Sequence, residues 1–291
     1  MRALGEELRS VRLANPFLLR SFDPPLAELE GRRLVELRRM GKRLVFGLEG
    51  EVFMVLHLMI AGRLQWEPSG AKVPKGYGLA ALDFESGTLL VTEAGKKRRA
   101  SLHLVRGDEA LRELDPGGLE VLQADPAALR EALERENHTL KRVLTDPRVV
   151  SGIGNAYSDE ILHRAKLSPF KQSRELSDDE WVRLHAAAVS VLREWVDRLS
   201  AEARASFPKK VTAFRPEMAV HGRFGLQCPV CGSAIQRIVH ADNESDYCPR
   251  CQTGGRVLAD RALSRLLKDA WPKTIDELEK RGGLDSRRRD G

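Results

Sequence analysis

The sequence contains two cysteine pairs, Cys228-Pro229-Val230-Cys231 and Cys248-Pro249-Arg250-Cys251, with sixteen residues between them. These four are all the cysteines of the chain. Two such pairs present four thiolates at tetrahedral positions, which is the arrangement that zinc prefers. Four sulfur ligands leave no open position for a substrate, so the spacing predicts one structural zinc ion in a small finger. The paired spacing disfavours the alternative, a cluster of cysteines that packs without metal.

Upstream of the cysteines the hydrophobic pattern is helical, and a glycine-rich segment interrupts it. Ser151-Gly152-Ile153-Gly154-Asn155 places two glycines one residue apart, which permits a tight turn whose backbone can approach another molecule. A helix that begins at Asn155 would point its first amides outward, where a phosphate can bind. On these residues alone, a plain loop between helices is an equally good interpretation. Farther on, Ser177-Asp178-Asp179-Glu180 is a capping box that opens a long amphipathic helix.

The first hundred or so residues have a strand-like pattern. Leu44 to Leu48 and Val52 to Leu58 flank one tight turn, and a second pair of short apolar runs flanks Ser86-Gly87. Two hairpins spaced in this way predict an antiparallel sandwich or barrel. Asp115-Pro116-Gly117-Gly118 then breaks the pattern, so a domain boundary is expected there.

Composition limits the class of protein and its partners. A chain of 291 residues is long enough for two domains, at roughly 100–200 residues each. Its 48 basic and 42 acidic residues give a net charge of +6, which favours a polyanionic partner without identifying it. The longest apolar runs are far shorter than the roughly 20 residues of a membrane span. The start of the chain does not have the layout of a signal peptide, so we expect a cytoplasmic protein without a membrane segment.

Taken together and in this order, the segments resemble the formamidopyrimidine-DNA glycosylase and endonuclease VIII family. Gly152 to Leu162 is similar to the helix–two-turns–helix motif of that family, and His221 to Gln252 is similar to its zinc finger. Arg39 to Arg43 and His57 to Leu64 are similar to its strand motifs. The resemblance covers about Leu8 to Gln252.

The patterns and the resemblance together predict an α+β multidomain protein. Its expected parts are an antiparallel β-sandwich over residues 1–118, a helix–two-turns–helix domain over 119–216, a four-cysteine zinc finger over 217–252, and a helical extension with a disordered basic tail over 253–291. The resemblance implies a base-excision repair DNA glycosylase with apurinic-site lyase activity. Such an enzyme flips an oxidised base out of double-stranded DNA, cleaves its N-glycosidic bond and cuts the strand. The expected partner is damaged or abasic DNA, bound by a monomer in the cytoplasm or, in a bacterium, at the nucleoid.

The resemblance also assigns roles to particular residues. Lys42 would lie beside the scissile sugar as an auxiliary catalytic residue, although a plain surface lysine beside a hairpin is the alternative. Lys141 and Asn155 would hold the DNA backbone that flanks the lesion. The remaining DNA contacts would be an apolar wedge at Ile60 and the paired arginines Arg98 and Arg99.

The beginning of the chain departs from the family pattern. In the family, an N-terminal proline amine attacks the sugar and a glutamate follows it, whereas Met1-Arg2-Ala3-Leu4 contains neither. We therefore expect the chain as given to form little covalent adduct with DNA. Two explanations are open: the true start lies upstream, or the protein binds damaged DNA without cutting it. A third possibility is a zinc-ribbon protein that binds RNA or protein, in which case the strand motifs match by accident.

Overall fold

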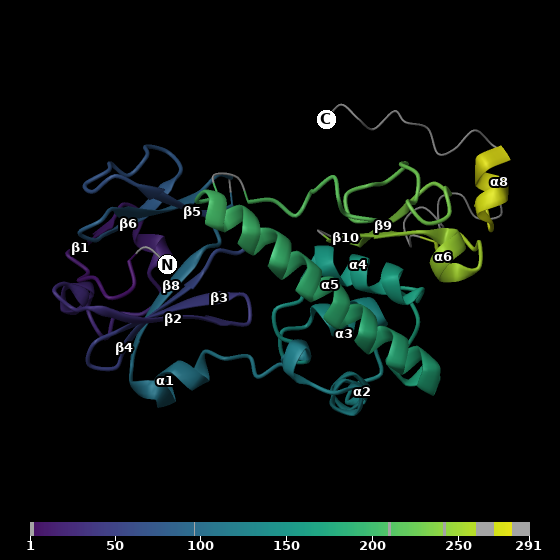
Figure 1. Ribbon diagram of the computed structural model, residues 1–291, viewed down its shortest axis with the longest axis horizontal. Helices are drawn as coiled ribbons and strands as arrows, with labels where there is room; N and C mark the ends of the chain where they lie inside the picture. Colours follow the sequence, from purple (N-terminus) through teal and green to yellow (C-terminus); the bar gives the residue numbers. More distant parts are fainter. Residues whose placement is uncertain (1–2, 96, 209–210, 241–242, 260–270, 281–291) are drawn as a thin grey trace. The chain divides into compact units, whose positions relative to one another are not determined.

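The computed structural model describes residues 3–95, 97–208, 211–240, 243–259 and 271–280 (Figure 1). The chain divides into two compact units. Unit 1 consists of Met1–Gly117 and Leu199–Val211, and unit 2 consists of Gly118–Arg198 and Thr212–Gly291. The predicted disordered tail, from about residue 282, lies outside the described residues.

Unit 1 is built from two four-stranded antiparallel sheets, as the sequence predicted. The first sheet has the order β1-β6-β7-β5, formed by Ser10–Leu13, Gly78–Asp83, Thr88–Glu93 and Gly62–Glu67. The second has the order β2-β3-β4-β8, formed by Leu34–Met40, Arg43–Leu48, Val52–His57 and Ser101–Arg106. Both predicted hairpins are present, as β3–β4 and β6–β7.

Strand β4 shows why the apolar runs in this unit are nearly continuous. Met54 and Leu56 point into the core between the sheets, whereas Phe53 and Val55 belong to a second cluster on the outer face. Helix α1, Gly107–Glu113, covers this outer face with Leu111. A strand that is buried on both faces needs apolar residues at every position, so strict alternation is lost.

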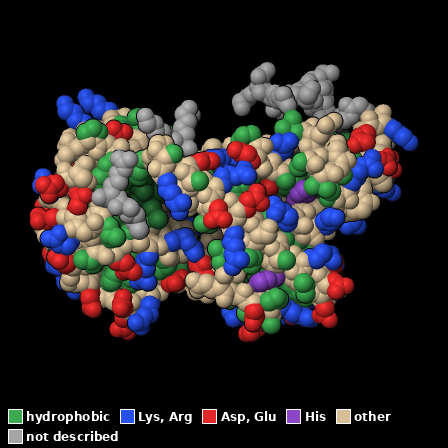
Figure 2. All heavy atoms as spheres, in the orientation of Figure 1, with side chains coloured by type: hydrophobic (Ala, Val, Ile, Leu, Met, Phe, Trp, Pro, Cys, Tyr) green, Lys and Arg blue, Asp and Glu red, His purple; other side chains and the backbone are tan. Residues whose placement is uncertain are grey.

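An apolar cavity of about 740 Å³ opens inside unit 1. Leu34 and Phe46 line it from one sheet, and Trp66 and Leu89 line it from the other. The last turns of helix α5 and Phe207 close part of its mouth. Figure 2 shows a recess with apolar walls in this part of the molecule. The space between the two sheets is therefore incompletely filled by the described side chains.

Unit 2 begins with helices α2, α3, α4 and α5, which span Pro126–Glu134, Leu140–Thr145, Asn155–Ala165 and Asp178–Ala205. Helix α2 starts as predicted, with Asp125 accepting a hydrogen bond from the amide of Ala128. The capping box of α5 is also confirmed, because the Ser177 amide donates to the Glu180 carboxylate at 2.9 Å. Trp181 and Trp195 are 3% and 4% exposed, so both tryptophans belong to the core.

The rest of unit 2 is a small zinc-finger-like module with a short extension. Strands β9 and β10, Gln236–His240 and Asn243–Tyr247, form an antiparallel hairpin, and helix α6, Pro249–Thr253, carries the second cysteine pair. Helix α8, Ile275–Lys280, packs on Val257. Among the described residues, no helix is both long and apolar enough to cross a membrane.

Candidate nucleic-acid interface and metal centre

Strand register gathers the predicted DNA-contacting residues of unit 1 at one end of the sandwich. Arg43 pairs with His57, and His57 pairs with Ser101, so the β2–β3 turn, the end of β4 and the start of β8 are neighbours. In the other sheet, Gly62 at the start of β5 pairs with Glu93 at the end of β7. The connections that carry Lys42, Ile60 and the arginine pair Arg98–Arg99 therefore leave the sheets at the same end.

This end of unit 1 concentrates positive charge. Desolvation lowers the pKa of His57, and the charges of Arg43 and Lys42 lower it further. Desolvation also lowers the pKa of His103, with contributions from Arg43 and Arg20. Both imidazoles are therefore held neutral near pH 7, because a further positive charge among these cations is unfavourable. An anion placed at this end would relieve that repulsion.

Lys42 follows Gly41 in the β2–β3 turn, and its side chain reaches solvent. The protein around it nevertheless removes part of its hydration, and this desolvation lowers the pKa of its ammonium group. A lysine with a lowered pKa gives up and regains a proton more readily near neutral pH. The position and the pKa direction are both compatible with the auxiliary role expected for this residue, which stays a prediction.

The β4–β5 and β7–β8 connections, which leave the sheets at the same end as Lys42, carry different kinds of side chain. Ile60 is 81% exposed in the β4–β5 connection, next to Met59, whose φ of 54° places it in the left-handed region. Arg98 and Arg99 are both exposed in the β7–β8 connection. The Arg98 guanidinium donates to the carbonyl of Gly76, and the Arg99 amide donates to the Glu93 carboxylate at 3.0 Å. An exposed apolar tip at the same end of the sandwich as two exposed arginines is suited to act as a wedge in DNA, with the arginines as its polar partners.

In unit 2, the glycine-rich turn ends where the sequence predicted, and α4 begins at Asn155. The Asn155 side-chain amide donates to the carbonyl of Glu244 in β10 at 2.7 Å. The turn that precedes α4 is thereby fixed to the finger hairpin.

The ammonium group of Lys141 is surrounded by oxygen atoms of α4. It donates to the Asn155 carbonyl at 2.8 Å, to Ser158 Oγ at 2.8 Å and to Asp159 Oδ1 at 2.5 Å. Its side chain is 15% exposed, and burial lowers its pKa while Asp159 opposes that shift. The predicted contact between Lys141 and the DNA backbone stays untested, and it would require at least one of these hydrogen bonds to break.

Asp159 continues this network into the finger. Its second oxygen lies 2.8 Å from Nδ1 of His221, and Asp246 accepts from the Gly222 amide at 2.7 Å and from the guanidinium of Arg237 at 2.8 Å. Asp159, His221 and Asp246 are close enough to hold a metal ion. Lys141 and Arg237 already balance the two carboxylates, so the group has no excess negative charge for a metal ion to neutralise.

Glu160 makes a second connection between α4 and the finger. Its carboxylate accepts three backbone hydrogen bonds, from the amides of Ala219, Val220 and His221, at 2.8–2.9 Å. Asp159, Glu160 and His221 were not predicted from the sequence as functional residues. The signal in the sequence that could have indicated them is the pair of adjacent acids, Asp159 and Glu160, inside a predicted helix. A buried acid requires a hydrogen-bond or charged partner, so such a pair predicts contacts with another segment.

The sulfurs of the four cysteines lie in two close pairs, at about the separation of ligands in a zinc site. Cys228 Sγ lies 3.9 Å from Cys251 Sγ, and Cys231 Sγ lies 3.3 Å from Cys248 Sγ. The edge of a tetrahedron with Zn–S bonds of about 2.3 Å is about 3.8 Å. Burial raises the pKa of the thiols of Cys248 and Cys251, so a cation is needed to hold both as thiolates at neutral pH. The donor set therefore fits a structural zinc ion.

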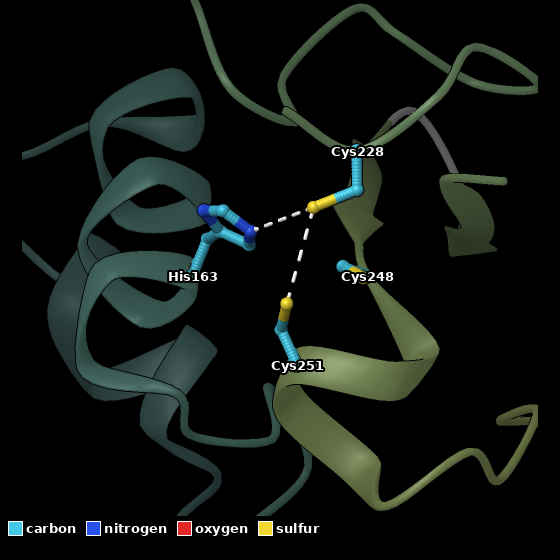
Figure 3. Close-up of side chains that lie close together, drawn as sticks. All are labelled: His163, Cys228, Cys248 and Cys251. Carbon is cyan, nitrogen blue, oxygen red and sulfur yellow. Dashed lines mark hydrogen bonds between the residues drawn. The ribbon is translucent and has the colours of Figure 1, made fainter. Parts of the chain in front are cut away.

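A histidine of α4 faces the same cysteines (Figure 3). Nε2 of His163 lies 3.3 Å from Cys228 Sγ, and the side chain is 6% exposed. Burial lowers the pKa of His163 to about 4, with help from the charges of Arg164 and Lys166. The imidazole is therefore neutral near pH 7. His163 was not predicted from the sequence as a functional residue.

Comparisons with known proteins agree with this architecture. Three family models match in order: the formamidopyrimidine-DNA glycosylase N-terminal domain over residues 1–101, the H2TH domain of the same enzyme over 118–205, and the zinc finger found in FPG and IleRS over 225–254. A formamidopyrimidine-DNA glycosylase of Thermus thermophilus is 36% identical over 260 residues, which are 87% of this chain and 93% of that protein. The chain belongs to the formamidopyrimidine-DNA glycosylase family.

Other family members give the same result. An uncharacterized formamidopyrimidine-DNA glycosylase-like protein of Mycobacterium tuberculosis is 46% identical over 157 residues, or 54% of this chain and 96% of that protein. The crystal structure of the Lactococcus lactis glycosylase bound non-covalently to DNA with an AP site has a TM-score of 0.75 at 25% identity, and covers 87% of this chain and 94% of that one. The predicted family and fold class are confirmed. The idea that the strand motifs match by accident is wrong, because the N-terminal model matches residues 1–101, which contain both motifs.

Proposed function

We propose that this protein is a base-excision repair DNA glycosylase with apurinic-site lyase activity on oxidised bases. The observation that carries the proposal is the 36% identity to a formamidopyrimidine-DNA glycosylase over nearly the whole of that protein. Solved structures of the Lactococcus lactis relative hold DNA with an abasic site or with Fapy-dG. The substrate proposed here is double-stranded DNA of the same kind. A damage-binding protein without catalysis is not favoured by these relatives.

The charged end of unit 1 is proposed to contact the damaged strand. Lys42 would bind a phosphate beside the lesion, and its lowered pKa suits it to move a proton during elimination. Ile60 would fill the gap that a flipped base leaves, since it is apolar and almost fully exposed. Arg98 and Arg99 would meet the base opposite that gap, where guanidinium groups can pair with base edges.

The start of α4 is proposed to hold the backbone of the DNA. Backbone amides at a helix start attract phosphate, and Asn155 is the first residue of α4. Lys141 would support this surface from beneath, because its ammonium group fixes the Asn155 carbonyl and Asp159. Phosphate contacts of this kind position a protein on DNA and carry little sequence information.

One structural zinc ion is proposed in the finger, held by Cys228, Cys231, Cys248 and Cys251. The sulfur–sulfur distances and the burial of Cys228 and Cys248 support it. When bound, the ion would fix the two cysteine pairs and so the position of the finger hairpin. We also propose that the protein acts as a monomer and that its chain has the four parts predicted from the sequence. Because the family works on DNA, the proposed location is the cytoplasm or the nucleoid.

The activity is tested on a duplex that contains one formamidopyrimidine base and on one that contains an abasic site. Release of the damaged base and strand scission are the expected results. Efficient trapping of a covalent adduct by borohydride would contradict the little adduct expected from Met1-Arg2-Ala3-Leu4, which contains no proline amine, and would point to another amine of the chain. Lys42→Ala should slow scission, whereas Arg9→Ala, an exposed cation at the opposite end of unit 1, should not. Tight binding of both duplexes with no base release and no strand scission would instead establish a damage-binding protein.

A further inference from the structure

Four donor atoms around the proposed zinc ion form a group that differs from the four cysteines. Nε2 of His163 and the sulfurs of Cys228, Cys248 and Cys251 all lie within 4.8 Å of one another. Cys231 Sγ lies outside this group, although it is 3.3 Å from Cys248 Sγ. Figure 3 shows the imidazole of α4 directed at the sulfurs of the finger. Three cysteines and one histidine form a common structural zinc site.

The distances fit a shared metal site. In a tetrahedral site with Zn–S of about 2.3 Å and Zn–N of about 2.0–2.1 Å, a nitrogen and a sulfur are separated by about 3.6 Å. The observed distance from Nε2 to Cys228 Sγ is 3.3 Å, and the neighbouring Cys228–Cys251 edge is 3.9 Å. Both values lie within a few tenths of an ångström of the tetrahedral edges.

Hydrogen bonds between α4 and the finger fix the position of His163 in addition to the cysteine sulfurs. Helix α4 is held against the finger by Glu160 through three backbone amides, and Gln252 Nε2 donates to the Leu167 carbonyl just beyond the helix at 2.9 Å. His163 is therefore presented to the sulfurs by a helix that has its own attachment to the finger. A preorganised donor costs little conformational entropy when it binds a metal.

The four cysteines differ in their access to solvent. Cys228 and Cys248 are buried, Cys251 is intermediate, and Cys231 is exposed. Oxidants and competing metal ligands reach an exposed thiolate first. Cys231, which lies outside the group that contains His163, is therefore also the cysteine most open to oxidation and to competing metal ligands.

We infer that His163 is a fifth donor of this metal site, and that it replaces Cys231 as the fourth zinc ligand when that thiolate is lost. While four thiolates hold the ion, Nε2 carries the proton and donates a hydrogen bond to Cys228 Sγ. As a ligand, Nε2 supplies its lone pair and the proton is on Nδ1. The finger then keeps its metal and its attachment to α4. This inference rests on the proposed zinc site, and it does not depend on DNA glycosylase activity.

The test compares metal content and cobalt spectra of the whole chain in five forms. These are the wild type, Cys231→Ala, His163→Ala, Cys231→Ala/His163→Ala and Cys231→Ala/His163→Gln. Cobalt(II) occupies zinc sites, and replacing one sulfur by a nitrogen moves its d–d bands to shorter wavelength. The glutamine variant can still donate a hydrogen bond to sulfur but is a poor zinc ligand, so it separates ligation from hydrogen bonding.

We expect Cys231→Ala to retain about one zinc ion per chain, with the cobalt bands shifted toward those of a three-sulfur, one-nitrogen site. His163→Ala should keep its metal with the spectrum of four sulfurs, which also shows that the helix tolerates the change. Both double variants should lose the metal. Two results would overturn the inference: loss of metal from Cys231→Ala alone, or retention of metal with one spectrum in Cys231→Ala and both double variants. A wild type that binds no metal would overturn the zinc proposal itself.

Discussion

Lys42 of unit 1 and Lys141 of unit 2 were both expected, by the same family resemblance, to contact DNA, yet their surroundings differ. Lys42 lies in a turn with its side chain in solvent, whereas the ammonium of Lys141 is bonded to three oxygens of α4. A motif identifies the position of a lysine in the chain but not its exposure. The comparison suggests that unit 1 offers exposed charge to DNA, whereas unit 2 uses buried charge to hold its own surface.

The largest effect is expected from removing the zinc ion proposed in the finger of unit 2. Cys248→Ser should reduce zinc to less than about half an equivalent per chain and should unfold the finger, since zinc binding by fingers supplies about 10–16 kcal/mol of folding free energy. The contacts of Asp159 and Glu160 with the finger should be lost with it, while unit 1 keeps its sandwich. Metal analysis and limited proteolysis measure both effects. Wild-type zinc content in this variant would contradict the assigned site.

The next effect is the loss of the buried ion pair in unit 2. Lys141→Ala leaves Asp159, which is 1% exposed, without its cation, so the free energy of unfolding should fall by about 3 kcal/mol. Lys42→Ala, at an exposed turn, should change it by less than about 1 kcal/mol. Urea denaturation of the two variants provides the comparison. Equal and small losses would mean that the Lys141 network does not stabilise unit 2.

DNA binding separates the two lysines in a different way. Lys42→Ala should reduce the dependence of log Kd on log salt by about one unit, because one phosphate contact is lost. Lys141→Ala should weaken binding while the wild-type slope is kept, since its charge serves α4. The binding constants are measured at four or more salt concentrations, with Arg9→Ala as the control. A flattened slope in Lys141→Ala would show that this residue does reach phosphate, as the resemblance implies.

The smallest effect concerns pH and the two histidines of unit 1. Folding lowers the pKa of His57 and His103 below the ordinary value of about 6.5, so the folded state binds fewer protons than the unfolded state. Their contribution to the free energy of unfolding is fully present above pH 6.5. It is lost as the pH falls toward the lowered pKa values of the folded state. The free energy of unfolding should therefore be smaller at pH 5.5 than at pH 7.5. His57→Gln/His103→Gln should reduce that difference, and an unchanged difference would exclude these histidines as its cause.

Local patterns were sufficient to predict much of the fold. The turn residues placed both hairpins, Asp125 and the Ser177 capping box placed two helix starts, and the helical spacing of Trp181 and Trp195 placed them in the core. Each of these features depends on residues that are close in sequence, so the chemistry can be recognised from the sequence alone.

The connections between α4 and the finger could not be predicted in this way. Asp159 and His221 are 62 residues apart, and His163 and Cys228 are 65 apart. No local rule indicates that these side chains meet, because their proximity depends on how the finger packs on the helix. The resemblance named Lys141 and Asn155 but could not show that both already have partners inside unit 2.

The central claim is that this protein recognises damaged DNA, and competition binding tests it most directly. A labelled duplex with one abasic site is bound at near-physiological salt and displaced by unlabelled abasic or intact duplex of the same sequence. We predict that the abasic duplex competes at least about tenfold better, because flipping a nucleotide that has no base avoids an unstacking cost of a few kcal/mol. Equal competition by the intact duplex would contradict the account and would leave only general attraction to phosphate.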